Sequence, residues 1–499
     1  MRFSADHQQL IRDAANLERA GDLTGAQASY QQLLALHPDL PDCWYNLALL
    51  QRRLGSPEAA LTSYQQALER GVMQPEHVHL NCAVIFSDYL HRYDAAEAAL
   101  HAALKCNRHY VPALLNLENL YEDLGRLKEA IALCEAILEQ DKQHCEALAR
   151  YANLQEVHDQ RDPLIERLRT AMQRPSADAA DRALVGFALG KVLDSCGAYD
   201  AAFAAYQAAN QCSRASARVT TRLFDRQQHT AFIDRIIRTF SESDIPTEPS
   251  AANAAPVFIC GMFRSGSTLL EQMLANHPRV ATCGELSFIP ELARSELAPF
   301  PEGSLTLPPE IRVQVATRYW RAACQYFQPE QVLIDKRPDN FLYIGLIKKI
   351  FPAAKFIVTQ RHILDNCLSV YFLHLDHSMG YALDLTDTGH YYLEHKRLMT
   401  HWQRLFDTDV LELSYDALVN DPRQEIARAL EFFGLPWDDA CLNVAAERSA
   451  VKTASLWQVR KQIYQHSSGR WRNYRAHIEE LARYVKTDLN AGRMLDGAR

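Results

Sequence analysis

Apolar and small residues recur in phase along the first 215 residues. Ala26 and Ala60 are 34 residues apart, and Ala96 and Ala130 show the same spacing. A tyrosine follows several of these alanines by four positions, so that both side chains share one helix face. A glycine precedes most of them by five residues, where a turn would fall. The pattern predicts helical hairpins that pack through small residues. It is carried by Gly21, Ala26, Tyr30, Gly55, Ala60, Tyr64, Ala96, Gly125, Ala130, Gly197, Ala202 and Tyr206.

The period and the pattern resemble the tetratricopeptide repeat. The resemblance covers about the first 215 residues and implies an all-α solenoid. Residues 145–174 form a degenerate repeat or a distorted junction. Arrays of this kind present an extended concave surface, so we expect a protein or peptide partner for this part of the chain. The alternative is a set of unrelated amphipathic helices.

The periodicity fades after residue 215. Residues 223–240 are expected to form one more helix, which could cap the array. Residues 241–256 are rich in proline, serine and alanine, a composition typical of linkers. We therefore predict a repeat array over 1–215, a capping helix and linker over 216–255, and a second domain over 256–499.

Beyond the linker, short apolar runs alternate with helical patterns. Strands are expected at 257–260, 332–335, 355–360 and 410–414. Helices are expected at 268–275, 341–350, 363–374, 389–406 and 423–433. Such alternation predicts an α/β domain with a parallel sheet.

The first of these strands leads into a glycine-rich turn and a helix. Gly261-x4-Gly266-Ser267-Thr268 nearly matches the phosphate-binding P-loop, in which a lysine precedes the last Ser or Thr. Ser267 replaces that lysine, which argues against ATP or GTP hydrolysis but not against phosphate binding. The glycines let the backbone approach a ligand, and the first N–H groups of a helix can bind an anion. The alternative is a Gly/Ser loop before a core helix.

Three basic residues follow strands in this domain, namely Arg264, Lys336 and Arg361. Ligands bind at the carboxyl ends of strands in open parallel sheets, so we expect the three cations to surround one anion. Ser369 lies eight residues after Arg361, on the helix that follows. The alternative for each basic residue is a solvated surface position.

These motifs, in this order, resemble the sulfotransferases that use 3′-phosphoadenosine 5′-phosphosulfate (PAPS). The segments FRSGSTLLEQMLANHP and DKRPDNF and the spacing of Arg361 and Ser369 carry the resemblance, which spans about residues 256–474. Within that family, the likeness is strongest to the protein-tyrosine sulfotransferases and to bacterial chains with tetratricopeptide repeats ahead of such a domain. It implies a P-loop-like α/β fold, PAPS as co-substrate and 3′-phosphoadenosine 5′-phosphate (PAP) as product. Sulfuryl transfer of this kind requires no metal.

The resemblance also implies roles for individual residues. The loop would hold the 5′-phosphosulfate through Arg264, Ser265, Gly266, Ser267 and Thr268. Arg361 and Ser369 would hold the 3′-phosphate, with Tyr415 near the nucleotide. Lys336 would lie near the bridging oxygen of the leaving group, and Ser455 near the sulfuryl group. Arg470, in Ser468-Gly469-Arg470-Trp471, matches a late basic and aromatic element that would cover the nucleotide.

The general base is assigned from a departure in the pattern. Protein-tyrosine sulfotransferases have Gly-Glu-Glu after His-Pro, and the second Glu acts as base in that branch. Here the residues are Gly284, Glu285 and Leu286, with one extra residue after His-Pro. We predict Glu285 as the base, with His374 and His377 as alternatives. The departure leaves the acceptor open among protein tyrosine, a carbohydrate hydroxyl, a lipid and a small phenol.

Composition narrows the class of protein. The chain has 499 residues, 48% of them hydrophobic and 23% charged, as in soluble globular proteins. The net charge of −8 argues against a general nucleic-acid binder. Residues 451–499 contain ten basic and four acidic residues, a net +6 that suits a cover over an anionic nucleotide. Twelve cysteines without zinc-binding spacing, no signal-peptide pattern and no membrane-length apolar run lead us to expect a cytoplasmic protein.

Three functions are compatible with these patterns. The first is a PAPS-dependent sulfotransferase whose repeat array recruits or positions the acceptor. The second is a non-catalytic adaptor that combines the repeats with a nucleotide-binding module. The third is a P-loop kinase or NTPase, against which Ser267 argues. The oligomeric state is not predicted.

Overall fold

The computed structural model describes residues 5–217, 224–241, 255–323, 328, 331–443 and 467–486. The chain divides into two compact units, Met1–Leu154 and Gln155–Arg499. The division falls within 145–174, the segment for which the sequence predicts a degenerate repeat or a distorted junction. The domain boundaries at 215 and 255 remain predictions.

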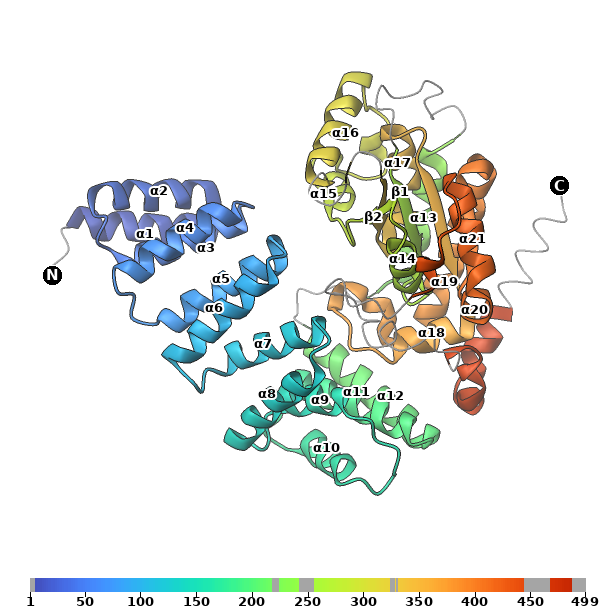
Figure 1. Cartoon of the computed structure of the whole chain (residues 1–499), viewed down its shortest axis with the longest axis horizontal. Coiled ribbons are helices and arrows are strands. Elements are labelled where there is room, and N and C mark those ends of the chain that lie inside the picture. Colours follow the sequence, from blue (N-terminus) through green and yellow to red (C-terminus); the bar gives the residue numbers. More distant parts are fainter. Residues whose placement is uncertain are drawn as a thin grey trace. The chain divides into compact units, whose positions relative to one another are not determined.

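The first unit consists of helical hairpins, as the repeat pattern predicts (Figure 1). The glycines between paired helices take the left-handed conformation, with φ between 74° and 85° at Gly21, Gly55 and Gly125, which favours glycine. The recurring alanines are fully buried, so the helices approach closely. The helices are α1 (Ala5–Ala20), α2 (Leu23–Leu36), α3 (Pro41–Arg53), α4 (Pro57–Glu69), α5 (Pro75–Val84), α6 (Tyr93–Cys106), α7 (Val111–Asp123), α8 (Leu127–Gln140) and α9 (Cys145–Leu154), with a π-helical turn, η1 (Ile85–Tyr89).

The second unit begins with helices before its sheet. These are α10 (Pro163–Gln173), α11 (Ala179–Ser195), α12 (Tyr199–Ser216) and α13 (Arg226–Thr239). Helices α11 and α12 form the last predicted hairpin, with φ of 71° at Gly197 in the turn. Gly190 is required by packing, because a Cβ there would lie 2.7 Å from the ring of Tyr206.

Five parallel strands form one sheet in the order β2-β3-β1-β4-β5. They are β1 (Val257–Gly261), β2 (Val280–Thr282), β3 (Val332–Lys336), β4 (Lys355–Gln360) and β5 (Val410–Ser414). The four predicted strands are present to within one residue. Strand β2 was not predicted, because its three residues carry no recognisable alternation.

Helices follow the strands and cover both faces of the sheet (Figure 1). They are α14 (Ser267–Ala275), α15 (Phe288–Arg294), α16 (Pro309–Ala323), α17 (Ile344–Ile350), α18 (Ile363–Tyr371), α19 (Leu385–Leu405), α20 (Tyr415–Asn420) and α21 (Pro422–Phe433). The 3₁₀ turn η4 (Pro338–Tyr343) replaces the start of the helix expected at 341–350. None of the described helices combines the length and the apolarity that a bilayer crossing needs.

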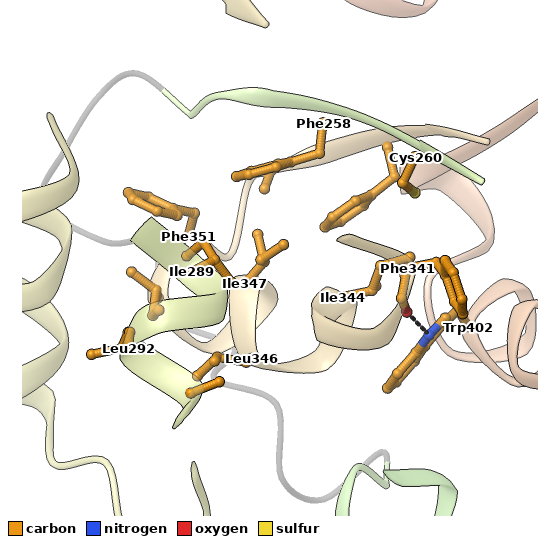
Figure 2. Packing of buried hydrophobic residues seen from close by; sticks show 14 of the residues in the cluster. Phe258, Cys260, Ile289, Leu292, Phe341, Ile344, Leu346, Ile347, Phe351 and Trp402 are labelled. Carbon is orange, nitrogen blue, oxygen red and sulfur yellow. Dashed lines mark hydrogen bonds between the residues drawn. The ribbon is translucent and has the colours of Figure 1, made fainter. Parts of the chain in front are cut away.

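Side-chain alternation along β1 divides the core into two layers. Val257 and Ile259 pack with α14 and α21, whereas Phe258 and Cys260 pack with α15, α17 and α19. Figure 2 shows the second layer, in which the indole N–H of Trp402 donates to the carbonyl oxygen of Phe341 at 2.8 Å. All five residues of β1 are buried, and β1 is the middle strand of the sheet. The glycine-rich loop follows directly after it.

Helix α13 is the helix expected at 223–240. The sequence suggested that it could cap the repeat array. Instead, Ile233, Ile236 and Phe240 join the core layer of Phe258 and Trp402. A glycine is required at 345 because a Cβ there would lie 2.4 Å from the Phe240 ring. The helix before the linker therefore packs as part of the sheet's own core.

Candidate active site

The loop between β1 and α14 holds its shape through two left-handed residues. Gly266, which precedes α14, has φ of 102°, and Arg264 has φ of 68°. A non-glycine residue in this region is strained, and such strain concentrates at functional sites. Gly266 provides no side-chain cap for α14. The helix N-terminus is thus arranged as an anion-binding end.

Side chains from neighbouring elements fix the loop to the sheet. The hydroxyls of Ser265 and Thr359 share a hydrogen bond of 2.6 Å. The amide of Asn366, on α18, donates to the carbonyl oxygen of Phe263 at 3.1 Å. The Ser265 hydroxyl therefore positions the loop, while Ser267 and Thr268, both buried, begin α14.

Two buried arginines meet beside this loop. Nε of Arg264 donates to the Ser369 hydroxyl at 3.2 Å, and Nη1 of Arg361 donates to the carbonyl oxygen of Arg264 at 3.3 Å. The Arg361 guanidinium lies 4.9 Å from the centre of the Tyr415 ring. Its buried Nε has no hydrogen-bond partner among the described residues. The structure thus brings together Arg264, Arg361, Ser369 and Tyr415, as the sequence predicted.

The electrostatics of this arginine pair favour a bound anion. Burial, and secondarily the charge of Arg361, lowers the pKa of Arg264 to about 10. Burial also lowers the pKa of Arg361, although Tyr415, Asp365 and Asp416 act in the opposite direction. Arginine side chains stay protonated in proteins, so the two guanidinium groups repel each other. An anion placed between them would offset this repulsion.

A second cluster surrounds Lys336 at the end of β3. Its ammonium group lies 2.6 Å from Oε1 of Glu285, which follows β2, and 3.6 Å from Oε2 of Glu271, on α14. Burial alone would lower the pKa of Lys336, but the two carboxylates raise it above its ordinary value. Strand β1 lies between β3 and β4, so Lys336 and Arg361 flank the loop from either side.

The predicted base Glu285 lies in this second cluster. Its side chain is 38% exposed, whereas Leu286 packs against the core. Glu285, and not the next residue, therefore lies against Lys336. The alternative His374 stacks on Phe187 of α11, with ring centres 5.2 Å apart. The side chain of His377 and the whole of Ser455 lie outside the described residues.

Residues 467–477, which we call the cover segment, are fixed next to Arg361. The segment includes η9 (Arg470–His477). Asp365 accepts hydrogen bonds from the backbone N–H groups of Gly469 and Trp471, both at 2.7 Å. Nη2 of Arg361 donates to the Ser467 carbonyl oxygen at 2.6 Å. Asp365 therefore positions the cover segment. Nothing in the sequence indicated this role, because a single carboxylate four residues after Arg361 is not a distinctive pattern.

Arg470 points toward α11 and not toward Arg361. Its guanidinium pairs with Asp194 at 2.7 Å and lies 5.2 Å from the centre of the Phe372 ring. Tyr474 donates a hydrogen bond to the same Asp194 carboxylate. Arg470 was predicted to bind the nucleotide; in the structure its side chain joins the cover segment to the hairpin of α11 and α12.

We expect Asp194→Ala to loosen the cover segment. The substitution leaves the charge of Arg470 and the hydroxyl of Tyr474 without their partner, at a cost of about 1 to 3 kcal/mol. Faster hydrogen exchange at residues 467–477 would reveal it. Asp200→Ala is the control, because Asp200 is 91% exposed and pairs with His477 of the same segment, where an ion pair contributes little. Equal exchange in both variants would contradict this role of Asp194.

We expect Gly266→Ala to distort the loop. A Cβ at this position would lie 2.5 Å from Cδ2 of Tyr415, in addition to the strain at φ of 102°. The control is Gly434→Ala, which has φ of 72° but open space around a Cβ. The control should lose about 1 to 2 kcal/mol, the cost of the left-handed conformation, and Gly266→Ala should lose more. Chemical denaturation measures both, and equal losses would contradict the predicted clash.

Within the described ranges, no group of three or more His, Cys, Asp and Glu side chains is arranged to hold a metal ion. Glu271, which contacts Lys336, was not predicted as a site residue. A single charged residue among the buried apolar residues of α14 was the available signal, since Leu269, Leu270, Met273 and Leu274 are all core.

Comparison with known proteins shows which protein families the two parts of the chain resemble. Residues 256–439 match the model of the sulfotransferase family, and residues 14–72 and 90–156 match tetratricopeptide repeat models. The chain is 32% identical over 388 residues to an uncharacterized protein of Aquifex aeolicus, covering 74% of this chain and 49% of that protein. It is 29% identical over 209 residues to protein-tyrosine sulfotransferase 1 of Danio rerio, covering 38% of this chain and 55% of that protein.

The chain thus spans about half the length of these curated relatives. Among solved structures, it matches the sulfotransferase domain of the Synechococcus PCC 7002 olefin synthase at 22% identity and a TM-score of 0.35, covering 49% of this chain and 98% of that domain. The family models fit both the helical repeats and the loop-bearing parallel sheet. This chain therefore joins tetratricopeptide repeats to a domain of the sulfotransferase family.

Proposed function

We propose that this protein is a sulfotransferase that moves the sulfuryl group from PAPS to a hydroxyl acceptor. The observation that carries the proposal is the pair of buried arginines beside the N-terminus of α14. One of them, Arg361, has a buried Nε without a hydrogen-bond partner among the described residues. A phosphate oxygen would supply that acceptor.

The positive charges of the site suit the anionic groups of PAPS. The loop from Arg264 to Thr268 offers the N-terminus of α14 to the 5′-phosphosulfate. Arg361 and Ser369 are assigned to the 3′-phosphate, with Tyr415 packed against the Arg361 guanidinium. The cover segment, fixed to Asp365, would close over the nucleotide.

The chemical roles in this proposal divide between Glu285 and Lys336. The acceptor oxygen forms a bond to sulfur while the bond between sulfur and the bridging oxygen breaks. Glu285 takes the proton of the acceptor hydroxyl, and the bond electrons remain on the phosphate of PAP. Lys336 stabilises the charge that grows on that phosphate. PAPS supplies the sulfuryl group. Glu285 deprotonates the acceptor, and Lys336 neutralises the charge on the leaving phosphate.

The acceptor in this proposal is a protein hydroxyl, with tyrosine as the first candidate. The Danio rerio relative is named for protein tyrosine. The tetratricopeptide repeats add a surface of the kind that binds peptides and proteins. We propose that they recruit the acceptor protein or a partner that presents it.

Two measurements test the proposal. Calorimetry should detect PAP binding to the full chain without magnesium. Mass spectrometry of tyrosine-containing peptides incubated with PAPS should then detect an added sulfuryl group that depends on Lys336. Absence of PAP binding would overturn the proposal. PAP binding without transfer to protein, carbohydrate, lipid or phenol acceptors would favour the adaptor instead, and magnesium-dependent ATP binding would favour a kinase or NTPase.

A further inference from the structure

Lys336 contacts two carboxylates, of which the proposed function uses only one. Glu285 lies 2.6 Å from the ammonium group and is the proposed base. Oε2 of Glu271, on helix α14, lies 3.6 Å from the same ammonium group. The side chain of Glu271 is 8% exposed and that of Lys336 is 1% exposed, so this contact is shielded from water. A buried carboxylate is costly unless it is paired, and its presence calls for an explanation.

The surroundings of Glu271 hold its carboxylate in one orientation. The Thr282 hydroxyl, at the end of β2, donates to Oε1, which leaves Oε2 directed at Lys336. Thr282 also accepts a hydrogen bond from the backbone N–H of Gly284 at 3.2 Å. Glu271 is therefore linked, through Thr282, to the same turn that carries Glu285.

Glu271 and Glu285 are the two described charged groups that face Lys336. Asp335, the preceding residue, is directed elsewhere, because it accepts from the Tyr319 hydroxyl at 2.9 Å and from the Asn340 amide at 3.3 Å. Burial raises the pKa of Glu271, and Lys336 opposes that effect. The charge state of the lysine therefore depends on the two glutamates together.

We propose that Glu271 is a positioning residue that keeps Lys336 charged and oriented when Glu285 becomes protonated during sulfuryl transfer. This inference rests on the proposed function. Once Glu285 accepts the acceptor's proton, its ion pair with Lys336 is lost. At that moment charge is growing on the leaving phosphate, and Lys336 must remain an ammonium group to stabilise it. Glu271, which does not exchange a proton with the acceptor, provides the remaining ion pair.

The test compares Glu271→Gln and Glu271→Asp with the full-length wild type. Gln keeps the size and the hydrogen bond from Thr282 but removes the charge. We expect Glu271→Gln to lower kcat by about 10- to 100-fold, the range found when the partner that orients a metal ligand is removed, with PAP affinity within about twofold. The alkaline limb of the kcat profile should move to lower pH, because Lys336 loses its proton more easily. Glu271→Asp should restore part of kcat and should move the alkaline limb part of the way back.

A second measurement does not depend on turnover. In protein labelled with ¹³C-lysine, NMR can follow the titration of Lys336, assigned by its loss in Lys336→Arg. We expect Glu271→Gln to lower the pH at which Lys336 titrates. The control is Glu425→Gln, since Glu425 is equally buried but pairs with Arg428 on α21, and it should leave Lys336 unchanged.

The outcomes separate the two proposals. If Lys336 titrates in Glu271→Gln as in the wild type, the role of Glu271 is overturned, whatever the activity. If the titration shifts but kcat and its pH profile do not, Glu271 has no part in transfer and the inference also fails. If the wild type transfers no sulfuryl group while the titration shifts, the proposed function fails and the control of Lys336 by Glu271 stands.

Discussion

Replacing Glu285 by Gln is expected to lower kcat by about 10² to 10⁴, the usual contribution of a general base, with little change in PAP affinity. Glu285 is the partly exposed carboxylate at 2.6 Å from Lys336, so it can meet both an acceptor hydroxyl and the cation. The amide cannot accept a proton, but it fills the same space. Lys336 would keep Glu271 as its ionic partner, so the fold should remain intact. Steady-state kinetics and calorimetry measure the two quantities.

The matched control for this substitution is Glu296→Gln. Glu296 is an exposed glutamate of the same domain that pairs with Arg318, and its replacement should leave kcat unchanged. Unchanged turnover in Glu285→Gln would refute the assignment and direct attention to His374. A variant that loses PAP binding together with kcat would show instead that Glu285 supports the nucleotide site.

Arg361→Ala is expected to weaken PAP binding by roughly 30-fold or more. Removing one partner of a buried, hydrogen-bonded charge pair costs about 2 to 5 kcal/mol, and each 1.4 kcal/mol is a tenfold change in affinity. The arginine also holds the Arg264 and Ser467 carbonyl oxygens, so the loop and the cover segment lose a common support. Calorimetry with PAP measures the loss.

Two further variants separate charge from fold. Arg361→Lys keeps the charge but not the fork of donors, so it should recover only part of the affinity. Arg423→Ala removes an exposed arginine that pairs with exposed Asp439 and should bind PAP like the wild type. Wild-type PAP affinity in a folded Arg361→Ala protein would contradict the assignment of this residue to the 3′-phosphate. Thermal unfolding establishes that each variant is folded.

The hairpin of α11 and α12 carries the repeat pattern but belongs to the compact unit of the sheet. Asp194 pairs with Arg470, and the buried amide of Asn210 donates to the Tyr371 carbonyl oxygen at 2.9 Å. The Tyr206 ring stacks on Phe372, with ring centres 4.0 Å apart. The cover segment and the end of α18 are thus supported from this hairpin, and variants that disturb its packing should affect nucleotide binding as well as stability.

The sequence by itself determined the elements that follow from local periodicity. The repeated alanines, tyrosines and glycines specify helical hairpins, because a helix brings residues four apart onto one face. The strands at 355–360 and 410–414 were predicted with their observed bounds, since apolar runs between turn signals suffice for buried parallel strands. The loop, Lys336 and Arg361 were also recognisable, because a residue after a parallel strand lies at the ligand-binding edge.

Only the tertiary structure decided contacts between residues far apart in the chain. In the structure Glu285 forms an ion pair with Lys336, whereas Leu286 packs against the core. Arg470 forms an ion pair with Asp194. The tertiary structure also made Glu271 a partner of Lys336, 65 positions away in the numbering, a pairing that depends on the neighbouring positions of α14 and β3. Local patterns contain no information on such pairs, because their geometry follows from sheet order and from helix packing. Most of the charged residues around the proposed site were therefore predictable from the sequence. Which of them contact one another was determined by the tertiary structure.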